Sequence, residues 1–206
     1  MKSGSVVLGI GLDNKRDWDI FKQVANKMKD FEFRVITHNN LKKEFFGYNN
    51  ITFLGNVSFL ETRREICEVD VLFLPTKENF YFSGQTTLFN ALAMKKPVIM
   101  PYDKNFEKYR LDKTLFYNRN SSLEEIVNLI EITIKEDKRV VKSVEFNHNL
   151  VIQEYNQIKF AKESNKKWIY LGYYVEECSS LSYKAQYTPY VTLEGRPMMD
   201  EDFIWN

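Results

Sequence analysis

Cysteine is scarce in this chain, and so are proline and glycine. The 206 residues include two cysteines, five prolines and eight glycines. Cys67 and Cys178 lie far apart in the sequence, so they indicate neither a disulfide framework nor the close spacing typical of a metal site. Cys67 is interpreted as a small residue of the core. A protein without disulfides is typical of a reducing compartment, and we therefore expect a cytoplasmic protein.

An excess of charge of either sign is also missing. The chain carries 29 Lys and Arg residues against 28 Asp and Glu residues, a formal net charge of +1. Surfaces that bind nucleic acid usually carry an excess of basic residues, so the composition predicts no nucleic-acid partner. The sequence also has no run of about twenty apolar residues and no basic segment followed by a short apolar one. We therefore expect neither a transmembrane segment nor a signal peptide.

Strand-like and helix-like segments alternate along most of the chain. Apolar runs of strand length are typical of buried parallel strands, and apolar residues at helical spacing indicate helices. Their alternation predicts right-handed crossovers and an α/β fold, a Rossmann-like doubly wound parallel sheet within residues 1–170. The expected strands are 5–10, 31–37, 51–54, 69–74, 97–100 and 114–117; the expected helices are 17–30, 58–68, one that begins near 85, 121–137, and 138–170 with a candidate break at 147–149.

Two of these helices have recognisable starts. Ser58 and Glu61 have the Ser-x-x-Glu spacing of a capping box. Asp13, Asn14 or Asp17 can cap the first helix, because a short polar side chain there accepts a hydrogen bond from a free backbone N–H.

The segment from Val69 to Pro101 is the strongest indication of a ligand site. It is expected to form a strand, a loop, a helix and a second strand in succession. The free N–H groups and partial positive charge of a helix N-terminus favour an anion, and a glycine lets the anion approach closely. Hydroxyl groups next to that glycine add donors. We therefore predict a phosphate site at the helix start, which consists of Ser83, Gly84, Gln85, Thr86 and Thr87.

The loop after the first strand is the second indication. Its sequence, GIGLDNKRDW (residues 9–18), includes Gly11 of the expected site and places Lys15 and Arg16 where they can reach an anion at the helix start. The alternative interpretation is that both cations are ordinary surface residues near a helix start. A dinucleotide fingerprint is disfavoured, because Asn14 stands at the third glycine position and no acidic residue ends the second strand.

The sequence SGQTTLFNALAMKKPVI resembles the donor-binding signature of GT-B-fold glycosyltransferases, a family 4-like group. The resemblance covers about residues 5–170 and implies that this region is one half of a GT-B fold, the nucleotide-sugar (donor) binding domain. It implies that the helix start holds the diphosphate of the nucleotide-sugar and that Arg16, preferred to Lys15 because it can bind bidentately, neutralises it. It further implies that the loop at Gly55 and Asn56 contacts the base through backbone atoms.

The chain departs from this family at one point. Retaining family 4 enzymes carry a pair of glutamates across the loop, whereas Phe82 and Asn90 stand at those positions here. Asn90 can still form hydrogen bonds with a ribose or sugar hydroxyl. Glu78 is a candidate for a displaced carboxylate. The catalytic residues therefore stay unassigned.

The resemblance implies a hexosyltransferase of polysaccharide biosynthesis. Such a protein would bind a UDP-sugar or GDP-sugar as donor substrate and transfer the hexose with a separate acceptor-binding protein, without a metal or another cofactor. Two alternatives stay open. The chain could be a noncatalytic nucleotide-sugar-binding or regulatory module, the remnant of a longer glycosyltransferase, or a structural or assembly subunit with an empty site.

Residues 171–206 are interpreted as a C-terminal extension of unknown role. They are rich in tyrosine and include Phe203 and Trp205 near the end, so their composition differs from that of a flexible linker. Three interpretations stay open: the extension packs on its own domain, it mediates self-association or binding to an acceptor-binding partner, or it is poorly ordered.

Overall fold

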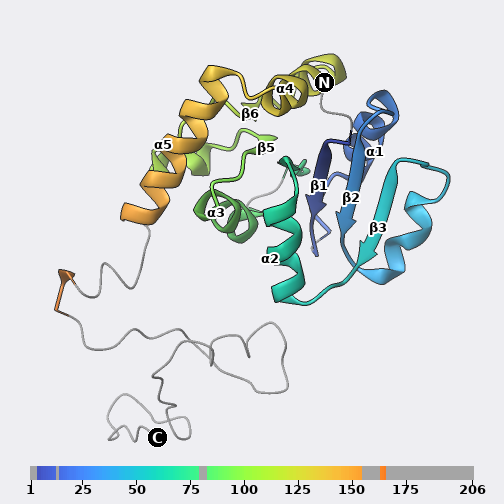
Figure 1. The fold of residues 1–206 in the computed structure, drawn as a ribbon, viewed down its shortest axis with the longest axis horizontal. Helices are drawn as coiled ribbons and strands as arrows, with labels where there is room; N and C mark the ends of the chain where they lie inside the picture. The colour runs from blue at the N-terminus through green and yellow to red at the C-terminus, as the bar shows by residue number, and fades with distance from the viewer. Residues whose placement is uncertain (1–3, 13, 79–82, 155–162, 166–206) are drawn as a thin grey trace, which may run out of the picture. The chain divides into compact units, whose positions relative to one another are not determined.

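The fold of this chain is built around one parallel sheet. A computed structural model describes residues 4–12, 14–78, 83–154 and 163–165. Within these residues a six-stranded sheet has the strand order β3-β2-β1-β4-β5-β6, and every neighbouring pair is parallel (Figure 1). This confirms the predicted α/β, Rossmann-like doubly wound fold. The strands are β1 (Val6–Ile10), β2 (Glu32–Ile36), β3 (Ile51–Gly55), β4 (Val71–Phe73), β5 (Val98–Pro101) and β6 (Phe116–Tyr117).

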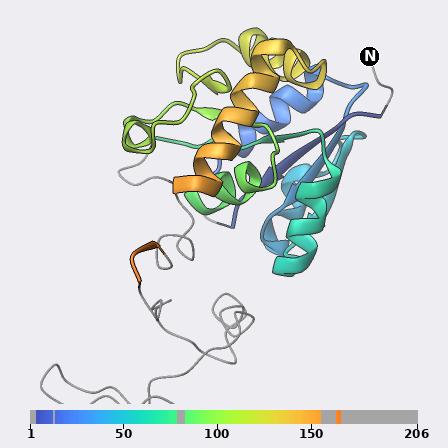
Figure 2. The ribbon, with the colours of Figure 1, turned by 60° about the vertical axis from the view of Figure 1, so that its left-hand side comes forward.

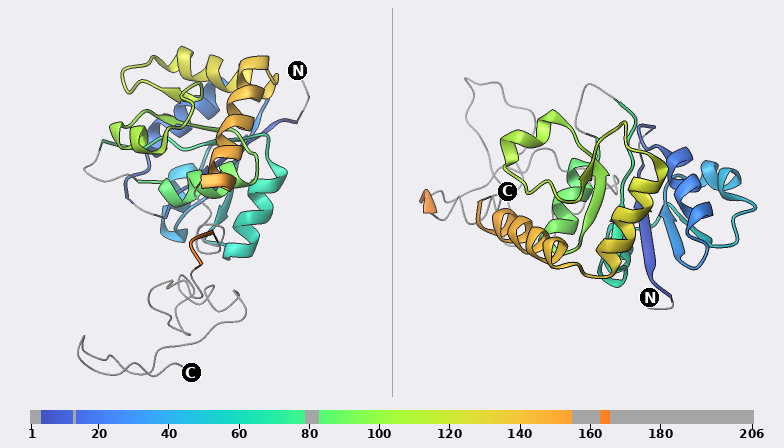
Figure 3. Two further views of the ribbon diagram at one scale, coloured as in Figure 1. Left: turned by 90° about the vertical axis from the view of Figure 1, so that its left-hand side faces the viewer. Right: turned by 90° about the horizontal axis from the view of Figure 1, so that it is seen from above.

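Helices cover both faces of the sheet. One hydrophobic cluster joins the sheet to α1 and α4, and a second joins it to α2 and α3, while α5 contributes side chains to both (Figures 2 and 3). The elements are α1 (Trp18–Lys27), α2 (Phe59–Glu68), α3 (Gln85–Ala93), α4 (Leu123–Ile134) and α5 (Lys138–Glu154), with short 3₁₀ helices η1 (Asn39–Phe45) and η2 (Lys104–Tyr109). All of them belong to a compact unit of residues 1–156.

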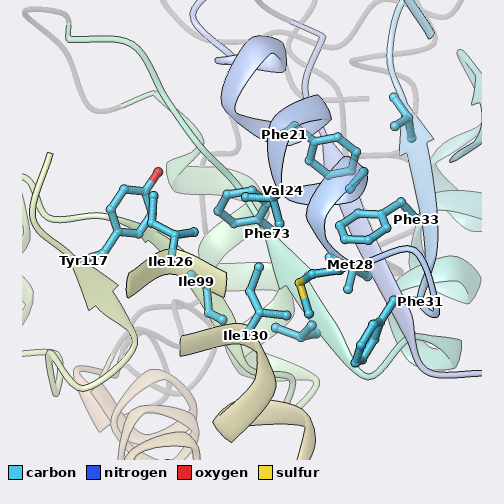
Figure 4. Packing of buried hydrophobic residues seen from close by; sticks show 14 of the residues in the cluster. Phe21, Val24, Met28, Phe31, Phe33, Phe73, Ile99, Tyr117, Ile126 and Ile130 are labelled. Carbon is cyan, nitrogen blue, oxygen red and sulfur yellow. The ribbon is translucent and has the colours of Figure 1, made fainter. Parts of the chain in front are cut away.

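Aromatic rings fill the core between α1 and the sheet. The Phe21 ring meets Phe33 edge-on at a centroid distance of 5.5 Å and stacks on Phe73 at 5.9 Å. Tyr117 continues this row beyond Phe73, with its hydroxyl pointing away from Ile99 (Figure 4). Phe21, Phe33 and Phe73 are fully buried, so these rings contribute a large share of the apolar area that stabilises the domain.

Several expected helix starts are confirmed. Asp17 caps α1, since its carboxylate accepts a hydrogen bond from the backbone N–H of Ile20. Ser58 and Glu61 form a complete capping box at α2, with hydrogen bonds in both directions. Because these signals need partners within one helical turn, the local sequence is enough to predict them.

Other expectations were wrong or lie outside the described residues. Cys67, expected in the core, is exposed, with its Sγ 3.9 Å from Met94 Sδ. The break expected near 147–149 does not occur, because α5 runs continuously to Glu154. The boundary predicted at residue 170 and the whole extension 171–206 lie outside the described residues.

A buried polar contact joins α5 to the loop before β6. Asn147, 3% exposed, accepts a hydrogen bond from the Asp112 N–H and donates one to the Asp112 carbonyl. Ser143 Oγ donates to the Asp112 carboxylate at 2.5 Å. Burial acts to raise the pKa of Asp112, but the hydrogen bonds from Ser143 and Thr114 outweigh it and hold that pKa below its usual value.

Replacing Ser143 with alanine is expected to destabilise the domain by about 1.5 kcal/mol at neutral pH, because a hydrogen bond to a charged group is lost. The folded-state pKa of Asp112 is depressed, so its contribution is present above the unfolded pKa, about 4, and is lost as the pH falls through the folded value. The loss caused by Ser143→Ala should therefore shrink below about pH 4. Urea unfolding across pH 3–7 measures it, and Ser143→Ala in an Asp112→Asn background is the control. An undiminished effect in that background would contradict the assignment.

Candidate functional site

The candidate site lies where the strand order of the sheet reverses. From β1 the chain builds outward through β2 and β3, and then returns to β4 on the other side of β1. In doubly wound sheets ligands bind at the carboxyl ends of the strands at this switch point. The loops that meet here follow β1 and β4. Backbone hydrogen bonds join them: the Asp17 N–H donates to the Pro75 carbonyl at 2.9 Å, and the Lys77 N–H donates to the Lys15 carbonyl at 2.8 Å.

Arg16 lies at the centre of this junction. Its backbone pairs with Thr76 in an antiparallel bridge, and its side chain is only 3% exposed. Gly11 makes room for that side chain, because a Cβ on Gly11 would lie 2.5 Å from Arg16 Nε. An arginine guanidinium stays protonated in proteins, so Arg16 brings a positive charge to the junction.

The N-terminus of α3 lies directly beside that charge. Gly84 is the N-cap residue, with a positive φ of 87°, a conformation that L-residues rarely adopt. A Cβ on Gly84 would lie 3.3 Å from Arg16 Nη1 and 3.4 Å from Nη2. Gly84 therefore serves two purposes: it permits the backbone turn that starts the helix, and it lets the Arg16 guanidinium approach the helix N-terminus. Together the two groups create a positive potential.

Tyr117 and Arg119 extend the site from β6, the strand at one edge of the sheet, and from the loop that follows it. Burial, followed by the negative charge of Asp17, raises the pKa of the Tyr117 phenol above its usual value, while Arg119 and Arg16 act in the opposite direction. The phenol therefore stays protonated at neutral pH. Arg119 Nη1 donates to the Thr76 carbonyl at 2.5 Å. Sequence reasoning missed Tyr117 and Arg119, because only the fold brings their loop to the junction.

The structure brings together part of the predicted set. Gly11, Lys15, Arg16 and Gly84 meet at the junction, and Ser83 directly precedes the N-cap of α3. Gln85 Nε2 instead donates to the Tyr109 hydroxyl of η2 at 2.5 Å. The remaining α3 residues differ in exposure, with Thr86 exposed and Thr87 and Asn90 half-buried.

The other predicted residues lie away from the junction or in less buried positions. Gly55 ends β3 and Asn56 follows it, and β3 is separated from β1 by β2. There the Asn56 N–H donates to Asn39 Oδ1 at 3.0 Å. Glu78 is exposed. Phe82 lies outside the described residues, together with Phe80 and Tyr81. Within the described part of the chain no cluster of three or more His, Cys, Asp or Glu residues could hold a metal ion.

None of the helices in the described ranges is long and apolar enough to cross a membrane.

A family model matches only the end of this chain. The model described as "Arginine-tRNA-protein transferase, C terminus" matches residues 150–194. An aspartate/glutamate leucyltransferase of Campylobacter jejuni (strain 81-176) is 47% identical over 51 residues, which are 24% of this chain and 21% of that protein. The leucyltransferase of Aeromonas hydrophila is 45% identical over 38 residues, 18% of this chain and 16% of its own. The chain thus spans about a fifth of the length of the curated relatives it matches.

The comparison with solved structures concerns the fold and covers most of the chain. Anabaena HepE in complex with UDP has a TM-score of 0.64 at 13% identity, over 80% of this chain and 48% of that one. Sucrose-phosphate synthase from Thermosynechococcus elongatus scores 0.61 at 14% identity, over 79% and 44%. WaaG, a glycosyltransferase involved in lipopolysaccharide biosynthesis, scores 0.57 at 12% identity, over 84% and 48%. The fold is that of about half of a GT-B glycosyltransferase, as the resemblance implied.

The functional interpretation drawn from that resemblance was wrong. The predictions of a hexosyltransferase, of a nucleotide-sugar partner and of polysaccharide biosynthesis are contradicted by the family match and the curated relatives, which are aminoacyl transferases by name. A fold hosts many functions, and the glutamate pair of the family was already absent. The exclusion of a nucleic-acid partner is contradicted as well, because the matching family is named for a tRNA. Net charge averages over the whole chain, so it does not describe one segment.

Proposed function

We propose that this chain takes part in aminoacyl transfer to protein through residues 150–194. The observation that supports this is the 47% identity to aspartate/glutamate leucyltransferases over 51 residues. The proposed donor is leucyl-tRNA, and the proposed acceptor is a protein whose first residue is Asp or Glu. An Asp or Glu within a chain has no free amine, so only the amino-terminal residue can be acylated. These substrates are consistent with a cytoplasmic protein.

The reaction follows from these two partners. The acceptor α-amine attacks the carbonyl carbon of the ester that joins leucine to the tRNA. An amide bond forms, the ester C–O bond breaks, and the tRNA ribose hydroxyl leaves with the proton that the amine releases. The step needs both substrates held in the right geometry, which is the main contribution that a protein can make to it.

The matched segment begins within the described domain rather than after it. Residues 150–154 form the last turn of α5. There Val151 is buried in the cluster with α2 and α3, Leu150 packs against the same cluster, and Glu154 pairs with Arg110. The first five residues of the matched segment are therefore part of the Rossmann-like domain.

The matched residues are a small part of the relatives. The 51 residues that match the Campylobacter protein are 21% of its length, so the proposal concerns only the share of the transfer reaction that this segment carries.

A split-enzyme assay tests this proposal. The Campylobacter jejuni leucyltransferase without the matched residues is expected to transfer labelled leucine from leucyl-tRNA to a peptide that begins with Asp only when the full chain studied here is added. The matched control is this chain ended at residue 156, which retains α5 but lacks most of the matched segment. A peptide that begins with acetylated Asp should stay unlabelled. Absence of transfer with the full chain, while the intact relative is active, would contradict the proposal.

A second candidate function belongs to the domain of residues 1–156: it binds a phosphoryl group. The observation that favours it is the buried Arg16 guanidinium beside the N-terminus of α3 at Gly84. In this proposal Lys15 lies at the rim, and Ser83, Thr86 and Thr87 border the site at the start of α3. Calorimetric titration with inorganic pyrophosphate tests it, and saturable binding that weakens as salt rises is the expected result.

A further inference from the structure

One residue joins the loop after β6 to both loops of the phosphoryl site. Arg119 Nη1 donates to the Thr76 carbonyl at 2.5 Å, and the same Thr76 pairs with Arg16 in the antiparallel bridge. Thr76 is 7% exposed. Three loops that are distant in sequence therefore meet at one peptide unit. Arg119 is the residue of the β6–α4 loop that reaches it.

Charged groups of both signs act on Tyr117 at this junction. The Tyr117 phenol is influenced by the positive charges of Arg119 and Arg16 and by the negative charge of Asp17. Asp17 Oδ1 is also engaged by the Ile20 N–H at the start of α1. Two guanidinium groups thus lie within electrostatic reach of one phenol, with one carboxylate opposing them. An anion would reduce the repulsion between the two cations.

We propose that Arg119 is a positioning residue of the phosphoryl site. By binding the Thr76 carbonyl it holds the strand-like segment that pairs with Arg16, so the Arg16 guanidinium stays against the N-terminus of α3. Arg119 also adds a second positive charge at the junction. This inference rests on the phosphoryl site proposed above, and it assigns a role to a side chain 103 residues away from Arg16 in sequence.

The role proposed for Arg119 requires a cationic side chain with an N–H donor that reaches the Thr76 carbonyl. Lysine supplies a charge and a donor but lacks the planar fork of arginine. Glutamine keeps a donor and loses the charge. The pair of variants Arg119→Lys and Arg119→Gln therefore separates the effect of charge from the effect of the hydrogen bond. Arg139, whose side chain is 77% exposed and pairs with Asp137 on the surface, is the matched control.

The experiment is calorimetric titration of the full chain and its variants with inorganic pyrophosphate at several salt concentrations. Arg119→Gln is expected to weaken binding by about tenfold or more and to flatten the dependence on salt, while Arg119→Lys recovers most of the salt dependence. Arg139→Gln should bind like the unmodified chain. Thermal unfolding is measured in parallel, because a purely structural role would lower the melting temperature without changing the salt dependence.

Two results would overturn the inference, and they are distinguishable. If the unmodified chain does not bind pyrophosphate, the phosphoryl site itself is wrong and the role of Arg119 falls with it. If the unmodified chain binds and Arg119→Gln binds equally well with the same salt dependence, the site stands and the role of Arg119 is wrong.

Discussion

Replacing Phe73 with alanine is expected to destabilise the domain by about 3–5 kcal/mol. Phe73 is fully buried in β4, stacked on Phe21 at 5.9 Å and 6.3 Å from the Tyr117 ring. Truncation removes the apolar area of the ring and leaves a cavity that a central strand and its covering helix fill poorly. Domains of this size are typically stable by only about 5–15 kcal/mol, so the variant should be close to unfolding. Guanidinium unfolding monitored by circular dichroism measures the loss.

Phe46 is the matched control for this prediction. It is the same residue type, but it is 64% exposed, so Phe46→Ala should change stability by no more than about 0.5 kcal/mol. Similar losses at both positions would show that the aromatic row of Phe21, Phe73 and Tyr117 does not hold the domain together as described.

Replacing Gly84 with alanine is expected to weaken pyrophosphate binding by at least about tenfold, as judged from the loss of a charged hydrogen bond. The new Cβ would lie 3.3 Å from Arg16 Nη1, closer than ordinary contacts, so the guanidinium must shift by a few tenths of an ångström at the point where it would meet the anion. The positive φ of 87° also adds about 1–2 kcal/mol of backbone strain for an L-residue. Calorimetry with pyrophosphate measures the first effect, and thermal unfolding measures the second.

Gly47 separates these two effects. It has the same φ of 87°, but nothing lies within 4 Å of a Cβ placed there. Gly47→Ala should therefore show the strain without any change in affinity. If Gly84→Ala and Gly47→Ala bind pyrophosphate equally well, the approach of Arg16 to the N-terminus of α3 has no role in anion binding.

The two kinds of similarity in this chain carry different information. The fold similarity covers 80% of the chain at 13% identity, and a fold shared at that level does not determine chemistry. The segment of residues 150–194 is much shorter, yet its relatives are up to 47% identical. The GT-B resemblance was therefore correct for the architecture and wrong for the function, which depends on particular residues rather than on strand order.

The sequence by itself determined the features that depend on near neighbours. The alternation of strands and helices, the capping box at Ser58 and the helix start at Gly84 follow from residues within one or two turns, and Asp17 was one of three candidate caps for α1. Such signals act through hydrogen bonds and periodicity along a single element, so they are readable before the chain folds.

Only the tertiary structure decided which distant residues meet. Arg119 reaches Thr76 across 43 positions, and Asn147 reaches Asp112 across 35. Helix α5 is continuous through Asn147, where the sequence suggested a break, and Cys67 is exposed. These outcomes depend on the order of strands in the sheet, which sets the loops that share an edge. Hydrogen bonds between such loops form only once the hydrophobic core has fixed that order, so no local pattern in the sequence predicts them.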